Sequence, residues 1–245
     1  MNRKLLRSTI FLLLFLFFLA FILIPDFSRA VLKFLFPTEI DRLYSRAALS
    51  ELVLEHILVV LISELLAVIF GCSLGIFVTR KRGKDYLPMI QSLASMAQTF
   101  PPSAVLALAI PLAGFGFKPV ILALFVYSCF PIISNTVSGL NSLSRDLLDA
   151  SRGLGMTEKQ IFLKTELPLA APVIMAGVRT STIINIGTAT IGAVAGAGGL
   201  GAVLMAGLIH NNSAYIFTGA LCAALLAFFT DKAFSVIDSR LLRPV

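Results

Sequence analysis

The sequence predicts an all-α membrane protein whose chain crosses the bilayer about six times. Hydrophobic residues fill 58% of the 245 positions, whereas a soluble domain is typically about half apolar. Charged residues make up only 13%, and most of them lie between long apolar runs rather than inside them. Such runs are expected to be helical in a membrane. The hydrocarbon core offers no hydrogen-bond partners, and a helix pairs all of its backbone N–H and C=O groups internally.

The first apolar run, Ser8–Ile24, follows a basic N-terminus and ends before Pro25. A cleaved signal peptide is one interpretation, because Ser28-Arg29-Ala30 fits a cleavage site. The run is longer than the about 7–15 apolar residues of a signal peptide, however, which favours a retained membrane helix. The mixed-charge segment Asp26–Glu51 suits a position outside the membrane. We therefore treat residues 1–51 as an N-terminal unit with one helix and an external segment.

Residues 52–245 form the membrane core in this prediction, with five further spans and one long polar loop, 138–168. The span at about Tyr86–Ala113 is predicted to be broken at Pro101-Pro102, since proline removes a helix hydrogen bond. A Gly-rich segment separates the last two spans. The five spans are Leu52–Val78, about Tyr86–Ala113, about Pro119–Val137, about Leu169–Ala193 and about Ser213–Phe234.

The distribution of Lys and Arg predicts the orientation, because cytoplasmic segments of membrane proteins are enriched in these residues. With the N-terminus in the cytoplasm, the cytoplasmic segments carry 14 basic residues and the external segments carry 5. Both termini and the loop 138–168 are then cytoplasmic. The cytoplasmic residues are Arg3, Lys4, Arg7, Arg80, Lys81, Arg82, Lys84, Arg145, Arg152, Lys159, Lys164, Lys232, Arg240 and Arg243, and the external ones are Arg29, Lys33, Arg42, Arg46 and Lys118.

The polar loop carries the start and stop signals of a first short helix. Ser144 is placed to cap this helix, because its hydroxyl can accept a hydrogen bond from an unpaired backbone N–H. The helix is predicted to extend through Arg152 and to be broken by Gly153-Leu154-Gly155. Gly155 is expected to adopt a positive φ, which other residues adopt only at a cost.

A second short helix is predicted directly after this break. Thr157 and Gln160 form a capping box, in which each side chain accepts a hydrogen bond from the other residue's backbone. The helix is predicted over Glu158–Leu167, ending before Pro168, because proline disfavours a helical conformation in the residue ahead of it.

The loop resembles the EAA loop of binding-protein-dependent ABC importer permeases, in which E-A-A is followed by Gly and then by I-x-L-P at fixed spacing. Every spacing is kept, and three letters differ: Asp149 for Glu, Ser151 for Ala and Thr165 for Ile. In that family the loop is a coupling helix that docks on a cytoplasmic ATPase. The resemblance assigns this ATPase-coupling role to Asp149, Ala150, Ser151, Gly155, Leu167 and Pro168.

The run Val178–Gly201, with Gly207-Leu208-Ile209, 223–227 and Asp231, is similar to the osmoprotectant branch of this family, the glycine betaine, choline and carnitine permeases. The resemblance implies a type I importer (MetI-like) permease fold that works by alternating access. It also implies a bacterial cytoplasmic membrane location and three protein partners: an ABC ATPase, an extracytoplasmic solute-binding protein and a second permease subunit, identical or paralogous. Amino acids or alkyl-sulfonates are the alternative solutes.

Other functions are disfavoured by the residues present. No G-x-x-x-x-G-K-[ST] sequence occurs, so ATP and Mg²⁺ are expected on a separate ATPase, and we expect no cofactor or metal in this chain. Gly196–Gly201 matches G-x-G-x-x-G, but no acidic residue follows about 20 positions later, as a dinucleotide site requires. The net charge of +7 lies mostly beside the spans, so no nucleic-acid partner is expected. His56 and His210 are expected to be interfacial polar residues, and a membrane enzyme or a passive channel is the remaining alternative.

Two charged residues, Glu64 and Arg179, are expected near the middle of the membrane. Such residues are costly in hydrocarbon and normally face a partner or a wet cavity. Either they pair across two spans, or Arg179 extends its charge to the interface and Glu64 is protonated or hydrated.

The chain has no Trp and only 4 Tyr, so a tight aromatic cage for a quaternary ammonium group is not expected. The residues that we assign to the translocation path are Glu64, Pro101, Tyr127, Arg179, Gly196, Gly198 and Gly199.

Overall fold

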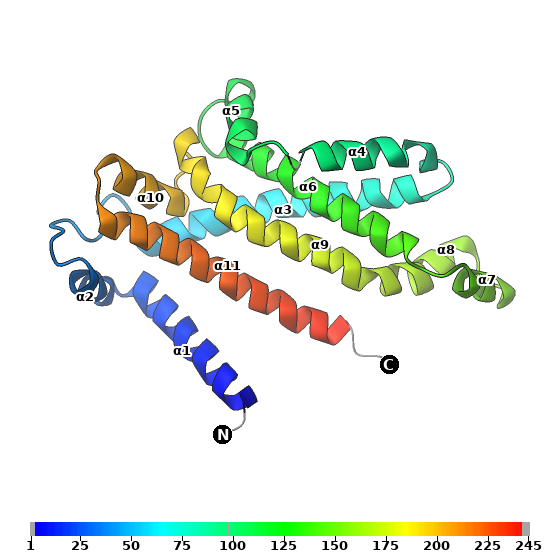
Figure 1. The fold of residues 1–245 in the computed structure, drawn as a ribbon, viewed down its shortest axis with the longest axis horizontal. Helices are drawn as coiled ribbons and strands as arrows, with labels where there is room; N and C mark the ends of the chain where they lie inside the picture. Colours follow the sequence, from blue (N-terminus) through cyan, green and yellow to red (C-terminus); the bar gives the residue numbers. More distant parts are fainter. Residues whose placement is uncertain (1–2, 98, 242–245) are drawn as a thin grey trace.

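The computed structural model describes residues 3–97 and 99–241, and these two ranges contain helices and no β-strand. The long helices run along one axis, with α2 and α10 near one end and the α7–α8 hairpin at the other (Figure 1). In chain order the elements are α1 (Arg3–Leu23), α2 (Pro25–Leu35), α3 (Leu49–Thr79), η1 (Lys84–Tyr86), α4 (Leu87–Ala97), α5 (Pro102–Ala113), α6 (Phe117–Asn141), α7 (Arg145–Gly153), α8 (Glu158–Ile161), η2 (Phe162–Glu166), α9 (Leu167–Thr188), η3 (Ala189–Ala195), α10 (Gly199–Ile209) and α11 (Ser213–Leu241).

Four helical segments in the described ranges are long and apolar enough to cross a membrane. The number rises to five if α1 and α2, which meet at an angle of 104°, count as one span. The all-α, multi-span fold is therefore confirmed, while the predicted number of six is approximate. The four segments are Leu49–Thr79, Phe117–Asn141, Glu158–Ala195 and Ser213–Asp238.

The first predicted helix is present as α1, and it ends one residue before Ile24, which is the N-cap of α2. Pro25 opens α2, a position where proline is favoured because the first turn of a helix does not use its N–H. The buried Ser28 hydroxyl donates to the Phe21 carbonyl oxygen at 2.7 Å. This contact joins α2 to the end of α1 across the bend. Part of the segment that we placed outside the membrane is therefore helical.

The predicted span Tyr86–Ala113 consists of two short helices, α4 and α5. The break falls at the predicted prolines, because Pro101 is the N-cap of α5 and Pro102 is its first residue. From α6, the Tyr127 hydroxyl donates to the Phe100 carbonyl oxygen at 2.6 Å. Neither α4 nor α5 is long enough to cross a membrane as a single helix.

Helices α3, α6 and α9 form the centre of the bundle, and glycines allow their close approach. A Cβ atom added at Gly75 would lie 2.7 Å from Thr136 Cβ, and one added at Gly71 would lie 2.9 Å from Ile132 Cγ2. Real Cβ atoms do not approach that closely. Small residues at a helix interface are what allow membrane helices to approach this closely.

The predicted helix end before Pro168 is wrong. Helix α8 continues through the π-helical turn η2 into α9, so that Glu158–Ala195 is one helical segment. In the π turn the Leu167 N–H reaches back five residues to the Phe162 carbonyl oxygen. Pro168 then occupies the first turn of α9. Its missing N–H is tolerated there, because the change of hydrogen-bond register has already occurred in the π turn.

The Gly-rich segment between η3 and α10 makes a tight bend. Gly196 and Gly198 have φ values of +78° and +71°, in the left-handed region. Helix α10 follows, and no helix was predicted here. Gly201 allows α10 to fold back onto η3, because a Cβ atom at this position would collide with the Thr190 carbonyl oxygen.

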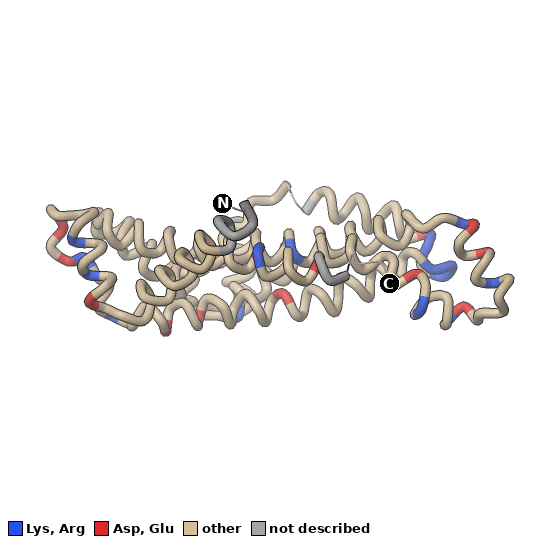
Figure 2. The backbone as a smooth tube through the Cα atoms, turned by 90° about the horizontal axis from the view of Figure 1, so that it is seen from below, with Lys and Arg blue, Asp and Glu red and all other residues tan. Residues whose placement is uncertain are grey.

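Charged residues gather mainly at the two ends of the long axis, with few between them (Figure 2). One end carries the α7–α8 hairpin, which we call the hairpin end. The other carries the 36–48 loop and the α10–α11 connection, which we call the loop end. An apolar middle between two charged ends is the pattern of a protein that spans a bilayer.

Candidate functional site

The α7–α8 hairpin begins with the caps that the sequence predicts. The Leu147 N–H donates to Ser144 Oγ at 3.3 Å. In the capping box, the Thr157 N–H donates to Gln160 Oε1 at 2.8 Å, and the Gln160 N–H donates to Thr157 Oγ1 at 3.3 Å. Both helix starts are therefore fixed by local hydrogen bonds, although the hairpin stands at the end of the bundle.

The turn of the hairpin depends on Gly155 and on one arginine. Gly155 has a φ of +77°, as predicted, and no heavy atom lies within 4 Å of a Cβ atom built there. Arg152 contacts both helices, because its Nη1 lies 2.8 Å from Asp149 Oδ1 and its Nε lies 3.0 Å from Glu158 Oε1. The hydrogen bond with Arg152 lowers the pKa of Glu158, and the one with Glu158 is the main cause that raises the pKa of Arg152.

The predicted coupling residues on α7 divide into two groups. Asp149 and Ala150 are exposed, whereas Ser151 is buried and its hydroxyl donates to the Leu147 carbonyl oxygen at 2.9 Å. Leu154, at the tip, is 82% exposed. The hairpin therefore presents a charged side and one large apolar side chain to whatever lies beyond the bundle.

The base of the hairpin is attached to α3. Arg80, the C-cap of α3, forms an ion pair of 2.5 Å with Glu166, and its guanidinium lies 4.6 Å from the centre of the Phe162 ring. Leu167 packs half-buried in the apolar cluster beneath, and Pro168 is exposed. Leu167 and Pro168 thus lie at the base, away from the tip that carries Gly155. Movement of the hairpin would act directly on α3 and on α9.

A second candidate site surrounds the Glu64 carboxylate, which lies between α3, α6 and α9. Glu64 is 6% exposed. Its Oε1 accepts from the Ser181 hydroxyl at 2.7 Å, and its Oε2 accepts from the Ser128 hydroxyl and the Asn185 amide, both at 3.1 Å. Asn185 also donates to Ser128 Oγ. In the described part of the chain, no Lys or Arg forms an ion pair with Glu64.

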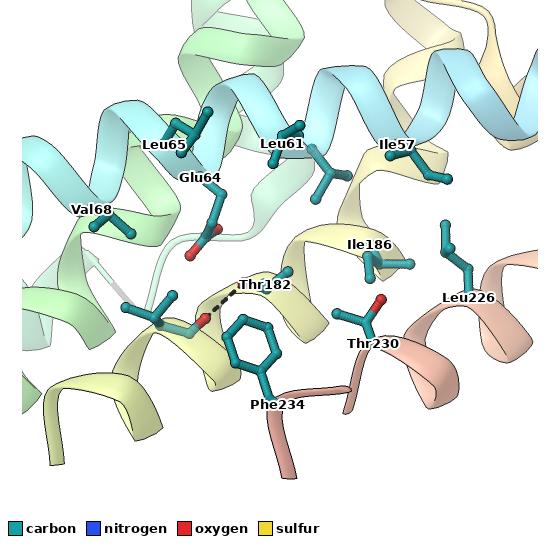
Figure 3. A pocket seen from close by; sticks show the side chains of 12 residues that line it. Ile57, Leu61, Glu64, Leu65, Val68, Thr182, Ile186, Leu226, Thr230 and Phe234 are labelled. Carbon is teal, nitrogen blue, oxygen red and sulfur yellow. Dashed lines mark hydrogen bonds between the residues drawn. The ribbon is translucent and has the colours of Figure 1, made fainter. Parts of the chain in front are cut away.

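A cavity of about 410 Å³ lies beside Glu64, bounded by α3, α9 and α11 (Figure 3). The figure shows the Glu64 side chain extending from α3 towards α9, with Phe234 of α11 below. The α3 side is open in the single chain, because Leu61 and Leu65 are 49% and 54% exposed. The lining residues are Ile57, Val60, Leu61, Glu64, Leu65, Val68, Val178, Thr182, Ile186, Leu226, Thr230 and Phe234.

Arg179 does not pair with Glu64, so the first of the two interpretations of these charges is wrong. The Arg179 guanidinium instead contacts α11, with Nη2 at 2.5 Å from Asp231 Oδ1 and Nη1 at 3.1 Å from Asp238 Oδ2. These two acids are seven positions apart, two turns along one face of α11. The second interpretation fails for Arg179 too, because its charge is paired inside the protein.

Two of the glycines assigned to the path, Gly198 and Gly199, lie against the first turns of α3. The Gly199 N–H donates to Glu55 Oε2 at 2.9 Å. His56 is only 2% exposed, and its Nε2 lies 2.9 Å from the Ile186 carbonyl oxygen. The prediction that His56 is an interfacial residue is therefore wrong: it connects α3 to α9 inside the bundle. His210 is exposed at the end of α10.

The structure brings some of the predicted path residues together and leaves others apart. Tyr127 contacts the α4–α5 break next to Pro101, and Gly198 and Gly199 lie against α3, whereas no such contact is present at Gly196 within the described part of the chain. Glu64 has neither group among its hydrogen-bond partners. Those partners, Ser128, Ser181 and Asn185, were missed, although the spacing of four between Ser181 and Asn185 places both on one helix face. The described residues contain no group of three or more His, Cys, Asp or Glu that could hold a metal ion.

Comparison with known proteins gives a consistent picture. A family model described as "binding-protein-dependent transport system inner membrane component" matches residues 67–243. A choline transport system permease protein of Bacillus subtilis is 43% identical over 188 residues, covering 76% of this chain and 85% of that protein. A glycine betaine/carnitine/choline transport system permease protein of the same organism is 40% identical, with coverage of 76% and 85%. An osmoprotectant import permease protein of Salmonella typhimurium is 36% identical, with coverage of 76% and 79%.

Solved structures show a related fold. An inward-facing structure of the MetNI methionine ABC transporter superposes with a TM-score of 0.70 at 24% identity, covering 78% of this chain and 94% of that chain. A chain of an amino acid ABC transporter with histidines superposes with a TM-score of 0.66 at 16% identity, covering 78% and 93%. These likenesses concern the arrangement of the helices, and they confirm the MetI-like fold.

Proposed function

This chain belongs to the family of binding-protein-dependent transport system inner membrane components, and we propose that it carries quaternary ammonium osmoprotectants across the bacterial cytoplasmic membrane. The solutes are glycine betaine, choline and carnitine, after which its two Bacillus subtilis relatives are named. In this proposal a separate ABC ATPase binds and hydrolyses ATP. The chain itself performs no covalent chemistry.

The α7–α8 hairpin is the observation that supports ATP-driven coupling. It stands at the hairpin end of the bundle, its tip carries the exposed Leu154, and its base contacts α3 through Arg80 and continues into α9. A subunit that pushes on this hairpin would therefore move two helices of the central bundle together. The same two helices carry Glu64 and its partners Ser181 and Asn185.

The proposed cycle is alternating access between the two sides of the membrane. An extracytoplasmic binding protein delivers the solute at the loop end, and a second permease subunit completes the path. ATP binding draws the ATPases together and moves the two hairpins, which changes the side to which the path opens. Both termini and the hairpin lie in the cytoplasm, in agreement with the 14 to 5 distribution of basic residues.

The experiment that tests this function is uptake in a bacterial strain that lacks its own osmoprotectant importers. The chain is expressed together with its proposed partners, an ABC ATPase and a solute-binding protein, and uptake of labelled glycine betaine, choline and carnitine is measured under osmotic stress. We expect accumulation of at least one of these solutes. Accumulation of an amino acid or an alkyl-sulfonate in their place would refute the solute assignment.

A matched pair of glycine substitutions tests the coupling role of the hairpin. Gly155→Ala forces a side chain into a φ of +77°, which costs about 1–2 kcal/mol of local conformational energy. Gly153→Ala, two residues away, adds the same methyl group in open space without a positive φ. We expect Gly155→Ala to reduce uptake and copurification of the ATPase, and Gly153→Ala to preserve both. Equal behaviour of the two variants would contradict a coupling role.

A further inference from the structure

We propose, building on the function proposed above, that Glu64 and the cavity beside it bind the cationic head group of the solute during its passage. We call this the cation site, and it consists of Glu64, Ser128, Ser181, Asn185 and the cavity that Glu64 lines. Nothing in the names of the relatives assigns such a site to the permease subunit.

First, the Glu64 carboxylate has no positively charged partner among the residues that the structure describes. An acidic group inside a membrane span is costly and normally faces a cation or a wet cavity. Arg179, the other charged residue that we expected near mid-membrane, contacts two aspartates of α11. Glu64 contacts three neutral donors instead. The charge that it lacks is the charge that a quaternary ammonium solute would bring.

Second, the hydrogen bonds at Glu64 suit a cation that has no N–H. A quaternary nitrogen has no N–H, so it cannot satisfy the acceptors of a bare carboxylate. At Glu64 the protein supplies the donors itself, two to one carboxylate oxygen and one to the other. The carboxylate can then attract a cation by charge without requiring a hydrogen bond from it. A primary amine or a guanidinium would gain less here, because three of the about four acceptor sites of the carboxylate are already occupied.

Third, the walls of the cavity are mostly apolar. Of its lining residues only Glu64, Thr182 and Thr230 are polar, and Phe234 contributes an aromatic ring. Methyl groups on a quaternary nitrogen need apolar contact, and aromatic faces attract such cations. The volume of about 410 Å³ falls in the range of about 300–1,000 Å³ that is usual for small-molecule sites. The carboxylate at one edge of the cavity matches the positive charge of the head group, and the apolar walls match its methyl groups.

A fourth, independent observation comes from Asn185, which is 1% exposed. Its Oδ1 has no hydrogen-bond partner in the described part of the chain, while its Nδ2 contacts Glu64 and Ser128. A buried acceptor without a partner is unfavourable, and here it belongs to the same amide that contacts a carboxylate. The described residues therefore leave the buried polar cluster around Glu64 incompletely satisfied.

The cation site predicts a selectivity that the binding protein alone would not produce. Choline carries a net positive charge, whereas glycine betaine also carries a carboxylate, which Glu64 would repel. Loss of the Glu64 charge should therefore reduce choline transport much more than glycine betaine transport. Two opposite charges lie a few ångströms apart in this partly buried site. The ratio of choline uptake to glycine betaine uptake is therefore expected to fall about tenfold or more when the Glu64 charge is lost.

The test compares labelled choline and labelled glycine betaine uptake in the strain described above, with the ATPase and the binding protein unchanged. Glu64→Gln keeps the shape and loses the charge, and Glu64→Asp keeps the charge. We expect the choline to glycine betaine ratio to fall about tenfold in Glu64→Gln and to fall much less in Glu64→Asp. An equal loss of both solutes, or no change in the ratio, would overturn the proposal.

A second pair of variants decides the matter if Glu64→Gln does not reach the membrane. Thr230 lines the cavity from α11, and Thr230→Lys places a positive charge there, while Thr230→Gln is its neutral control. We expect Thr230→Lys to lower the ratio and Thr230→Gln to leave it near the wild-type value. Equal ratios in the two variants would also overturn the proposal. Failure of the wild-type chain to take up either solute would instead refute the function on which the cation site rests.

Discussion

Removing the Arg179 side chain should destabilise the contact between α9 and α11 by an amount that the structure allows us to bound. Arg179 faces Asp231 and Asp238, and the three side chains are 29%, 29% and 23% exposed. Breaking a fully buried ion pair costs about 3–5 kcal/mol, whereas an exposed pair contributes about 0–1 kcal/mol. For this intermediate burial we expect Arg179→Met to cost about 2 kcal/mol.

A cost of this size is measurable as a shift in thermal stability. For a chain of this length, 1 kcal/mol corresponds to a Tm change of about 2–4 °C, so the purified Arg179→Met protein should melt about 4–8 °C below wild type. The assay is thermal unfolding in detergent, followed by the fluorescence of a thiol-reactive dye that reports exposure of buried cysteines. Cys222 is a suitable reporter, because it is fully buried in α11.

Asp231→Asn provides the partner variant for a double-mutant cycle. Once Arg179 is replaced, the Asp231 carboxylate keeps only its 3.7 Å contact with Lys232 of the same helix. Removal of its charge should therefore recover part of the lost stability. The Tm of the double variant should therefore exceed the value obtained by adding the two single shifts. A Tm within 1 °C of wild type for Arg179→Met, or strictly additive shifts, would refute the view that this ion pair joins α9 to α11.

Three further predictions concern the packing, the topology and the hairpin. Gly75→Val should reduce the amount of folded protein in the membrane, because the added Cβ atom would lie 2.7 Å from Thr136 Cβ. Overpacking of this kind costs about 1–3 kcal/mol. An unchanged yield would contradict the α3–α6 packing. In a background without cysteines, a membrane-impermeant thiol reagent should label Lys33→Cys but not Lys159→Cys in intact cells, and the reverse pattern would overturn the topology. The pKa of Glu158 is lowered in the folded protein. Its contact with Arg152 should therefore stabilise the hairpin above the ordinary Glu pKa of about 4.3, and this stabilisation should be lost as the pH falls through the lowered pKa of the folded protein. A dye on Met156→Cys should report this acid transition in the Glu158 protein and not in Glu158→Gln.

Local signals in the sequence predicted much of the fold. The caps at Ser144 and Thr157 and the positive φ of Gly155 depend on residues a few positions apart, so the sequence shows them directly. The helix end before Pro168 was wrong for a reason that is also physical. Proline disfavours helix in the preceding residue on average, but a π turn shifted the hydrogen-bond register and made the position tolerable.

The candidate site was less accessible to sequence reasoning, because its contacts join residues far apart in the chain. Glu64 meets Ser128 and Ser181, and Arg179 meets Asp231, across separations that no periodicity reveals. Two isolated charges near mid-membrane suggested a pair. The structure instead gives each its own partners, and only the positions of the helices in space could distinguish these arrangements.

The most direct test of the account is reconstitution of the purified chain in liposomes. Without partners, the chain should neither accumulate choline or glycine betaine nor respond to an ion gradient, because this account places the energy source on a separate ATPase. Addition of the ATPase, the binding protein and ATP should start uptake, and an ATPase variant that binds but does not hydrolyse ATP should not sustain it. Accumulation driven by a sodium or proton gradient without the ATPase would contradict the account.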